Sequence, residues 1–526
     1  MKHKYLFFSY IGVFLLTVFF MFIGIVYLNN GHFTYTLDDA YIHLALAENI
    51  QKGHYGINLN EMSAPSSSIL WPFLLSVFSV FTLYEYVPLF LNVICAISSL
   101  YVLYNVIVMS TEDETYRYAL VKYCIPLFVL SANTFGLIFC GMEHSLQVLS
   151  IVSIAWCLIR IEKKLHVPAI LCVVIFLVAA VTRYENFAVI VPAIIYIYTK
   201  KKTSLALLLS GTVIIPVLGF SLFLLSNEME FLPSSILVKS KQIFPFNLSL
   251  NFLTKWIVNL IYPRGLLMIA LMCICFYLRK KQIVSPLLTV LITAIVLQWF
   301  AGSYGVFVYC RYSPYIISFA LLLCVYVFSG LLKDNLDTIT TYKKRIVICV
   351  MLINLDILVI TLTIPFAGNN IYQQHYHIHK FVNEFYKKPV AVNDLGYVSF
   401  NNDRYVLDLY GLGNYDSLNN RLIFSDKSKK TLLAANKSYH GEHDWMSLNM
   451  DRYDVDLAII YEHWFKIPEN WKKVAELSFS SLKVTAASNT VSFYISSSQP
   501  EEEIRLSLSK FKKSLKGKKD MTLQMY

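Results

Sequence analysis

The first 365 residues contain apolar runs of about 20 residues each, separated by short charged patches. A run of this length spans the ~30 Å hydrocarbon layer of a bilayer as a helix, because only a helix satisfies its own backbone in lipid. The charged fraction of the chain is 15%, whereas a soluble protein carries roughly 25%. From Phe366 onward, Asp, Asn, Lys and Glu are interspersed as in a water-soluble domain. The sequence predicts a polytopic α-helical membrane protein with a C-terminal α/β domain.

The apolar runs predict eleven transmembrane helices. They lie near residues 5–28, 87–109, 119–139, 143–160, 167–182, 187–199, 203–226, 264–279, 283–300, 312–332 and 346–365. A further run, 69–81, is short enough to lie along the membrane surface as an interfacial helix. With this arrangement nearly every basic cluster of the membrane half is cytoplasmic, as the positive-inside rule requires. We therefore expect a cytoplasmic N-terminus and an extracytoplasmic C-terminal domain.

Three parts follow from this division: a membrane domain at 1–365 with its first extracytoplasmic loop at 29–86, an α/β domain at 366–498, and a basic tail at 499–526. Runs rich in Val, Ile and Tyr predict the strands of the α/β domain. They lie at 389–392, 404–409, 455–461, 475–479 and 490–495, with a helix at 425–436. The tail is expected either to lie on anionic headgroups or to be solvated and disordered.

The net charge of +11 does not indicate nucleic-acid binding, because the basic residues cluster at the ends of apolar runs. All ten cysteines precede residue 350 and lie in or beside those runs. We interpret them as buried apolar side chains rather than a disulfide framework. The apolar stretch after Lys4 is too long for a cleaved signal and predicts an uncleaved anchor helix.

The polar motifs of the membrane half share one predicted side of the bilayer. They are Asp38-Asp39, Gly141-Met142-Glu143, Thr182-Arg183-Tyr184-Glu185-Asn186, Lys239 to Lys241 and Arg311-Tyr312. We expect acidic and basic groups from these separate loops to converge on one cavity. Adjacent carboxylates such as Asp38 and Asp39 are costly at membrane depth and indicate function, although a helix N-cap is an equally good interpretation.

These motifs resemble those of bacterial GT-C glycosyltransferases, nearest to the group with the terminal arabinofuranosyltransferases. Protein O-mannosyltransferases and lipid A aminoarabinose transferases are similar at a greater distance. The first loop carries Asp38-Asp39-Ala40-Tyr41-Ile42, Ala47-Glu48-Asn49, Gly53-His54-Tyr55-Gly56 and Ser66-Ser67-Ser68-Ile69-Leu70-Trp71. Further matches are Gly141-Met142-Glu143, Thr182 to Asn186, Pro233 to Lys239, Arg311-Tyr312 with Pro314, Val392-Asn393-Asp394-Leu395-Gly396 and Asp408 to Leu412. Tyr184, Asn186 and the early Pro314 depart from the family pattern and leave the donor sugar open.

The resemblance implies a membrane glycosyltransferase that transfers a sugar, with inversion, from a polyprenyl-phosphate carrier to a hydroxyl of an envelope glycan, glycolipid or protein. A general base is needed at the acceptor, and either Asp38 or Asp39 can supply it. By analogy with the family, Asp38 is the base and Asp39 orients the acceptor. The leaving phosphate requires fixed cations, for which we expect Arg311 first, then Lys239 and Arg183. The remaining predicted substrate-binding residues are Tyr41, His43, His54, Glu143, Glu185 and Tyr312.

Glu143 and Glu185 have a second interpretation, a structural ion pair with Arg183. The resemblance also implies a bacterial inner membrane and no cofactor, and it leaves a divalent metal open. The alternating run His375-Tyr376-His377-Ile378-His379 would place three imidazoles on one side of a strand, but no carboxylate or cysteine is fixed beside it, so we predict no metal site there. Two other functions compete: a transporter or flippase of a lipid-linked saccharide, and a non-catalytic envelope assembly protein.

Overall fold

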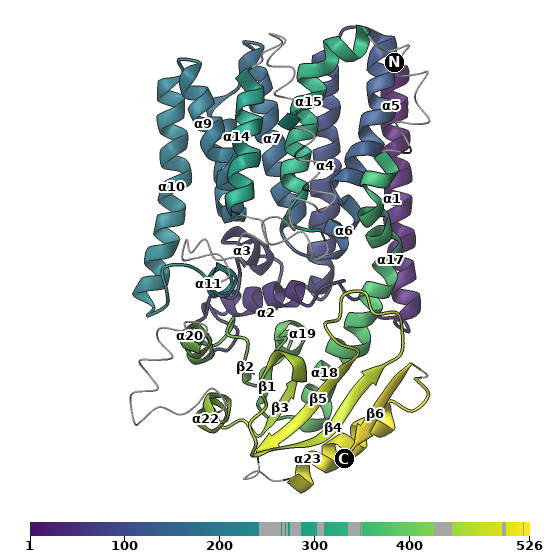
Figure 1. The fold of residues 1–526 in the computed structure, drawn as a ribbon, viewed down its shortest axis with the longest axis vertical. Coiled ribbons are helices and arrows are strands. Elements are labelled where there is room, and N and C mark those ends of the chain that lie inside the picture. The colour runs from purple at the N-terminus through teal and green to yellow at the C-terminus, as the bar shows by residue number, and fades with distance from the viewer. Residues whose placement is uncertain are drawn as a thin grey trace.

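The computed structural model describes residues 1–240, 286–301, 310–334, 350–424, 444–496, 501–518 and 520–526, with a few isolated positions between 265 and 348. A helical bundle occupies one end of the molecule and a sheet with its covering helices occupies the other (Figure 1). Within the described residues the chain is mostly helical, as a polytopic membrane protein requires.

Five helical segments are long and apolar enough to cross a bilayer. They are α1 (Lys2–Leu28), α4 (Val87–Ser110) with the turn before it, α7 (His144–Glu162), α10 (Thr203–Ser226), and a segment that begins with α17 (Leu355–Ile371) and continues to Tyr386. Shorter apolar helices are α8 (Ala169–Thr182), α9 (Phe187–Thr199), α14 (Pro286–Ala301) and α15 (Pro314–Asp334). The sequence prediction of a membrane-type helical half is confirmed at this level.

The outer surface of the bundle is apolar. In α1 the side chains of Tyr5, Phe8, Val13 and Phe20 are each more than half exposed. A soluble protein rarely exposes a contiguous apolar face of this extent. In contrast, α7 is largely enclosed by the other helices. This pattern suggests insertion into a membrane with α7 near the centre of the bundle.

Two details of the predicted helices differ from the structure. The run at 119–139 is divided into α5 (Glu114–Ser131) and α6 (Thr134–Phe139), because Asn133 between them has the left-handed backbone angle φ of 49°. The short run at 69–81 forms only α3 (Leu70–Ser76) as an α-helix. Most of the predicted span at 264–279, and all of the predicted helix at 425–436, lie outside the described residues.

The α/β domain contains one six-stranded sheet of order β2-β1-β3-β5-β4-β6. Its strands are β1 (Val390–Val392), β2 (Val406–Asp408), β3 (Leu457–Ile460), β4 (Trp471–Phe479), β5 (Thr490–Ser496) and β6 (Met521–Met525). β1 pairs in parallel with both β2 and β3, whereas β3, β5, β4 and β6 pair antiparallel in turn. The predicted strands before residue 496 are all present.

The prediction of a separate basic tail is wrong. Helix α23 (Glu501–Ser514) packs Ile504, Leu508 and Phe511 into the core, and β6 then pairs with β4 at the sheet edge. Lys510, Lys512 and Lys513 lie on the exposed side of this amphipathic helix. A high lysine content therefore marked one face of a packed element, which is the usual composition of a surface helix.

One hydrophobic cluster contains buried residues of both halves. Its buried members include Ile25 and Ile364 from the long helices, Trp71 from the first loop, and Val390 and Phe493 from the sheet. Helix α2 (Asp39–Gln51) lies across the junction between bundle and sheet (Figure 1). Further along the same loop, Asn58 exchanges two hydrogen bonds with the backbone of Val406 in β2, at 3.0 and 2.9 Å. The first loop therefore packs against the α/β domain and connects it to the helical half.

Candidate functional site

A cavity of about 390 Å³ lies at the junction of the helical half and the α/β domain. The carboxylate, imidazole and guanidinium groups that line it belong to Asp38, Asp39, His43, Arg311, His375 and Asp394. The convergence predicted for Asp38, Asp39 and Arg311 is therefore present in the structure. These three residues come from two segments of the chain, and the Arg311–Asp39 contact joins positions that are 272 residues apart.

Asp38 immediately precedes α2, and its carboxylate reaches across to the α/β domain. Oδ2 accepts a hydrogen bond from the backbone N–H of Gly396 at 2.7 Å, and Oδ1 accepts one from Tyr397 at 2.8 Å. Both donors lie at the start of the short helix α19 (Gly396–Ser399). A Cβ at position 396 would lie 2.2 Å from the backbone oxygen of Asp38, so only glycine fits there.

Burial raises the pKa of Asp38 to about 6, and the nearby Asp394 carboxylate acts in the same direction. His375 and the N–H groups of Tyr397 and Gly396 oppose this rise by favouring the charged form. The carboxyl group is therefore able to accept a proton close to neutral pH, which is where general bases work best.

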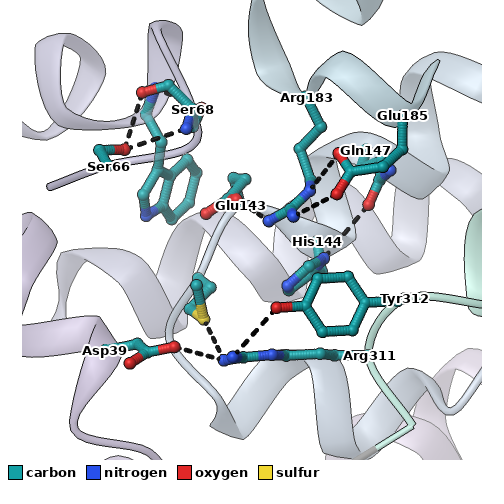
Figure 2. A network of polar contacts seen from close by, with 12 residues as sticks. Asp39, Ser66, Ser68, Glu143, His144, Gln147, Arg183, Glu185, Arg311 and Tyr312 are labelled. Carbon is teal, nitrogen blue, oxygen red and sulfur yellow. Dashed lines mark hydrogen bonds and ion pairs between the residues drawn. The ribbon is translucent and has the colours of Figure 1, made fainter. Parts of the chain in front are cut away.

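Asp39 forms an ion pair with Arg311, in which Nη1 donates to Oδ2 at 2.7 Å (Figure 2). Arg311 is 6% exposed. Its Nη1 also contacts the sulfur of Met142 at 2.9 Å and its Nη2 contacts the hydroxyl of Tyr312 at 3.3 Å. Within the described residues, Nε of Arg311 is buried without a hydrogen-bond partner. The guanidinium is held at the cavity wall and keeps donor capacity for an anion.

Arg183 lies in a neighbouring buried network (Figure 2). It donates to Glu143 at 2.5 Å and to both oxygens of Glu185 at 3.1 and 2.8 Å. These bonds form the structural ion pairs of Glu143 and Glu185 with Arg183 that the sequence offered as the alternative to sugar binding. None of the three lines the cavity, so the structure does not bring Arg183 to the position predicted for a phosphate ligand.

His43 and Tyr312 link this network to the cavity. Nε2 of His43, which lines the cavity, lies 3.4 Å from a carboxylate oxygen of Glu143. The ring of Tyr312 lies between the two guanidinium groups, with its centroid 5.2 Å from Arg183 and 5.1 Å from Arg311. Tyr312 therefore positions both arginines and does not itself line the cavity.

Three other predicted residues lie elsewhere. Tyr41 is fully buried and packs on the ring of Tyr397 at 3.9 Å, because it faces the core side of α2. The Nε2 of His54 contacts the backbone oxygen of Glu61 at 2.9 Å and stabilises the loop. Neither Tyr41 nor His54 lines the cavity. Lys239 belongs to α11 (Ser234–Ser240), and its side chain lies outside the described part of the chain.

Sequence reasoning assigned no role to His375 and Asp394, which contact each other at 3.2 Å across the cavity wall. The histidine run is helical rather than extended, so its side chains diverge: His377 contacts the backbone oxygen of Tyr372, and His379 contacts Asn383. Among the described residues no group of three potential metal ligands occurs. The signal for Asp394 was its place directly after a buried parallel strand, where functional side chains gather.

Another part of the cavity wall is built from loops of the sheet. Tyr410 and Leu412 follow β2, and Trp464 follows β3. The carboxylate of Asp408 accepts backbone hydrogen bonds from Tyr410 at 2.8 Å and from Gly413 at 2.8 Å, which folds this loop. Burial raises the pKa of Asp408 to about 6 and these N–H groups oppose the rise.

In a comparison with known families, a family described as "Domain of unknown function (DUF8728)" matches residues 369–494. This segment is the α/β domain up to β5, and it contains Asp394, Tyr410 and Trp464. A search of curated proteins finds none that matches the chain.

Proposed function

We propose that the chain is a GT-C-type membrane glycosyltransferase that transfers a sugar from a polyprenyl-phosphate carrier to a hydroxyl of a cell-envelope acceptor. One observation carries the proposal: a carboxylate with a near-neutral pKa, Asp38, and a buried guanidinium, Arg311, line the same cavity. The cavity lies where apolar helices meet a polar domain, so a lipid-borne donor and a water-soluble acceptor can both reach it.

The chemistry is a single displacement. The acceptor oxygen attacks the anomeric carbon of the donor while the bond from that carbon to the phosphate oxygen breaks. Asp38 takes the hydroxyl proton, and the departing polyprenyl phosphate keeps the electron pair of the broken bond. Arg311 stabilises the charge that develops on the phosphate. Asp39 holds Arg311 in place through the 2.7 Å ion pair.

The proposal includes an orientation. Eleven spans, a cytoplasmic N-terminus and an α/β domain on the periplasmic side of a bacterial inner membrane place the cavity at the extracytoplasmic face. The five long apolar helices support insertion into a membrane, and the distribution of Lys and Arg supports the orientation.

A transporter or flippase is less well supported. Transporters usually place their polar groups near the middle of the membrane, whereas here loops of the α/β domain form one wall of the cavity. A non-catalytic assembly protein does not require the Asp38 carboxyl to be held between two backbone donors at the edge of a cavity.

Mass analysis of envelope glycolipids, glycans and glycoproteins from cells with and without the protein tests the function. We expect one sugar to be missing from one acceptor when the chain is absent, and restored by the wild type but not by Asp38→Asn. An unchanged envelope, or full restoration by Asp38→Asn at equal abundance, would contradict an enzyme that uses this base.

A further inference from the structure

The two walls of the cavity have different chemistry. Arg311 is the one arginine or lysine among the described lining residues, and it lies on the helical wall. The domain wall presents the aromatic rings of Tyr410 and Trp464 beside the polar side chains of Asn393 and Asp394. An anionic lipid phosphate therefore has its partner on the helical wall, which leaves the domain wall for the second substrate.

The domain wall lies at the position where open α/β sheets bind ligands. From β1 the chain moves to β2 on one side and then to β3 on the other, so the strand order reverses beside β1. Ligands of such sheets bind at the carboxyl ends of the strands at this reversal. Asp394, Tyr410 and Trp464 all follow the carboxyl ends of these three strands.

A nucleotide or other phosphate ligand does not suit this position. In doubly wound sheets the phosphate binds the N–H groups that begin the helix after the first strand. Here the N–H groups of Gly396 and Tyr397, which begin α19, already donate to the carboxylate of Asp38. The ligand expected on the domain wall is therefore uncharged.

The two rings are held in place before any ligand arrives. Their centroids lie 5.4 Å apart with the planes inclined by 48°. The guanidinium of Arg421 lies 3.7 Å from the centroid of the Tyr410 ring. Tyr461 packs edge-on against Trp464 at 5.2 Å. Trp464 remains 37% exposed, so part of its ring is open to contact. Rigid aromatic rings bind with little loss of conformational freedom.

We infer that Tyr410 and Trp464 form an acceptor subsite for a saccharide, in which a sugar ring packs on the indole and its hydroxyls bond to Asn393 and Asp394. An aromatic face beside a few fixed polar groups suits a ligand that is apolar on its C–H face and polar at its rim. This inference rests on the proposed function and specifies it further: the acceptor is a glycan, not a bare protein side chain or a lipid headgroup.

The test uses the full chain in lipid nanodiscs. The probe is the water-soluble glycan released by mild acid from the envelope of cells that lack the protein, because unmodified acceptor accumulates there. Equilibrium dialysis gives its affinity, and transfer assays give KM for acceptor and donor separately. We expect Trp464→Ala to weaken glycan binding and raise the acceptor KM at least 10-fold, with donor KM unchanged. Tyr410→Ala should act in the same direction.

Two controls separate this effect from misfolding. Trp464→Phe keeps a ring and should retain most of the affinity, and Tyr415→Ala removes an equally exposed aromatic that does not line the cavity. The subsite is refuted if the wild type does not bind the glycan, or if Trp464→Ala binds it as well as the wild type. If binding depends on Trp464 but the wild type transfers no sugar, the subsite stands and the glycosyltransferase proposal fails.

Discussion

Replacement of Asp38 by asparagine isolates the role of the carboxylate, because the two side chains have nearly the same shape. In the native protein both carboxylate oxygens accept backbone hydrogen bonds, at 2.7 Å from Gly396 and 2.8 Å from Tyr397. An asparagine amide has one oxygen and one NH2 group, so one of these N–H donors must face another donor. The substitution therefore perturbs both catalysis and the attachment of the α/β domain.

The expected losses of stability and of catalytic rate differ in size. A hydrogen bond to a charged group is worth about 1.5–3 kcal/mol, and an orphaned buried donor costs about 1–3 kcal/mol. On this basis alone Asp38→Asn would lower the free energy of unfolding by about 2–4 kcal/mol. The substitution also removes a charge that burial disfavours, so we expect the net loss near neutral pH to be smaller. Loss of a general base costs roughly 10²–10⁴-fold in rate, and the sugar-transfer rate should fall by that factor at saturating donor and acceptor.

The assay measures transfer to the glycan probe in nanodiscs, with thermal unfolding followed on the same samples. Gly396→Ala is the matched variant, because its methyl group collides with Asp38 while the carboxylate is retained. If Gly396→Ala destabilises the protein as much as Asp38→Asn but keeps a much higher rate, the carboxylate acts in the chemistry. Equal rates for the two variants at equal stability would refute the assignment of Asp38 as base and leave it a structural contact.

Three further outcomes are expected. Burial raises the pKa of Asp38 to about 6, and the base must be deprotonated, so kcat/KM should rise with pH and level off above about 6; a profile that is flat from pH 5 to 8 would contradict this. The protonated Asp38 carboxyl group also stabilises the folded state. This contribution to stability is fully present below the unfolded pKa of 3.8, and it is lost as the pH rises through 6. Arg311→Lys should raise the donor KM at least 10-fold and leave the acceptor KM unchanged, because lysine cannot bind phosphate through a planar fork; an unchanged donor KM would exclude phosphate binding there. Leu508→Ala, at a fully buried position in α23, should cost about 2–5 kcal/mol in thermal or chemical unfolding, whereas a mobile tail would show no change.

The histidine run shows why a local sequence pattern was not enough to predict the secondary structure. Alternation of His375, His377 and His379 fits a strand, but the segment continues the helix of α17 because tertiary packing buries Ile378 and Phe381 against the sheet. The same context turned the lysine-rich end of the chain into α23 and β6. Periodicity shorter than two helical turns does not distinguish these outcomes.

The positions of Arg183 and Arg311 illustrate a second limit. Both arginines sit in short polar motifs at the ends of apolar helices, and the sequence made both of them candidate phosphate ligands, with Arg311 first. Only the packed structure shows that Arg183 is enclosed by Glu143 and Glu185 while Arg311 lines the cavity. The difference depends on which carboxylates approach each guanidinium, and those come from other loops.

By itself the sequence determined the division into an apolar helical half and a polar α/β half, and the short polar motifs in which Asp38, Asp39 and Arg311 occur. These follow from hydropathy and strand composition, which act locally along the chain. Tertiary structure alone decided that the carboxylate of Asp38 binds the backbone N–H groups that begin α19, that His375 and Asp394 join the same cavity, and that Tyr410 and Trp464 line it together with Arg311. Those contacts join residues far apart in the chain, and they exist only because one hydrophobic core packs the sheet against the helices.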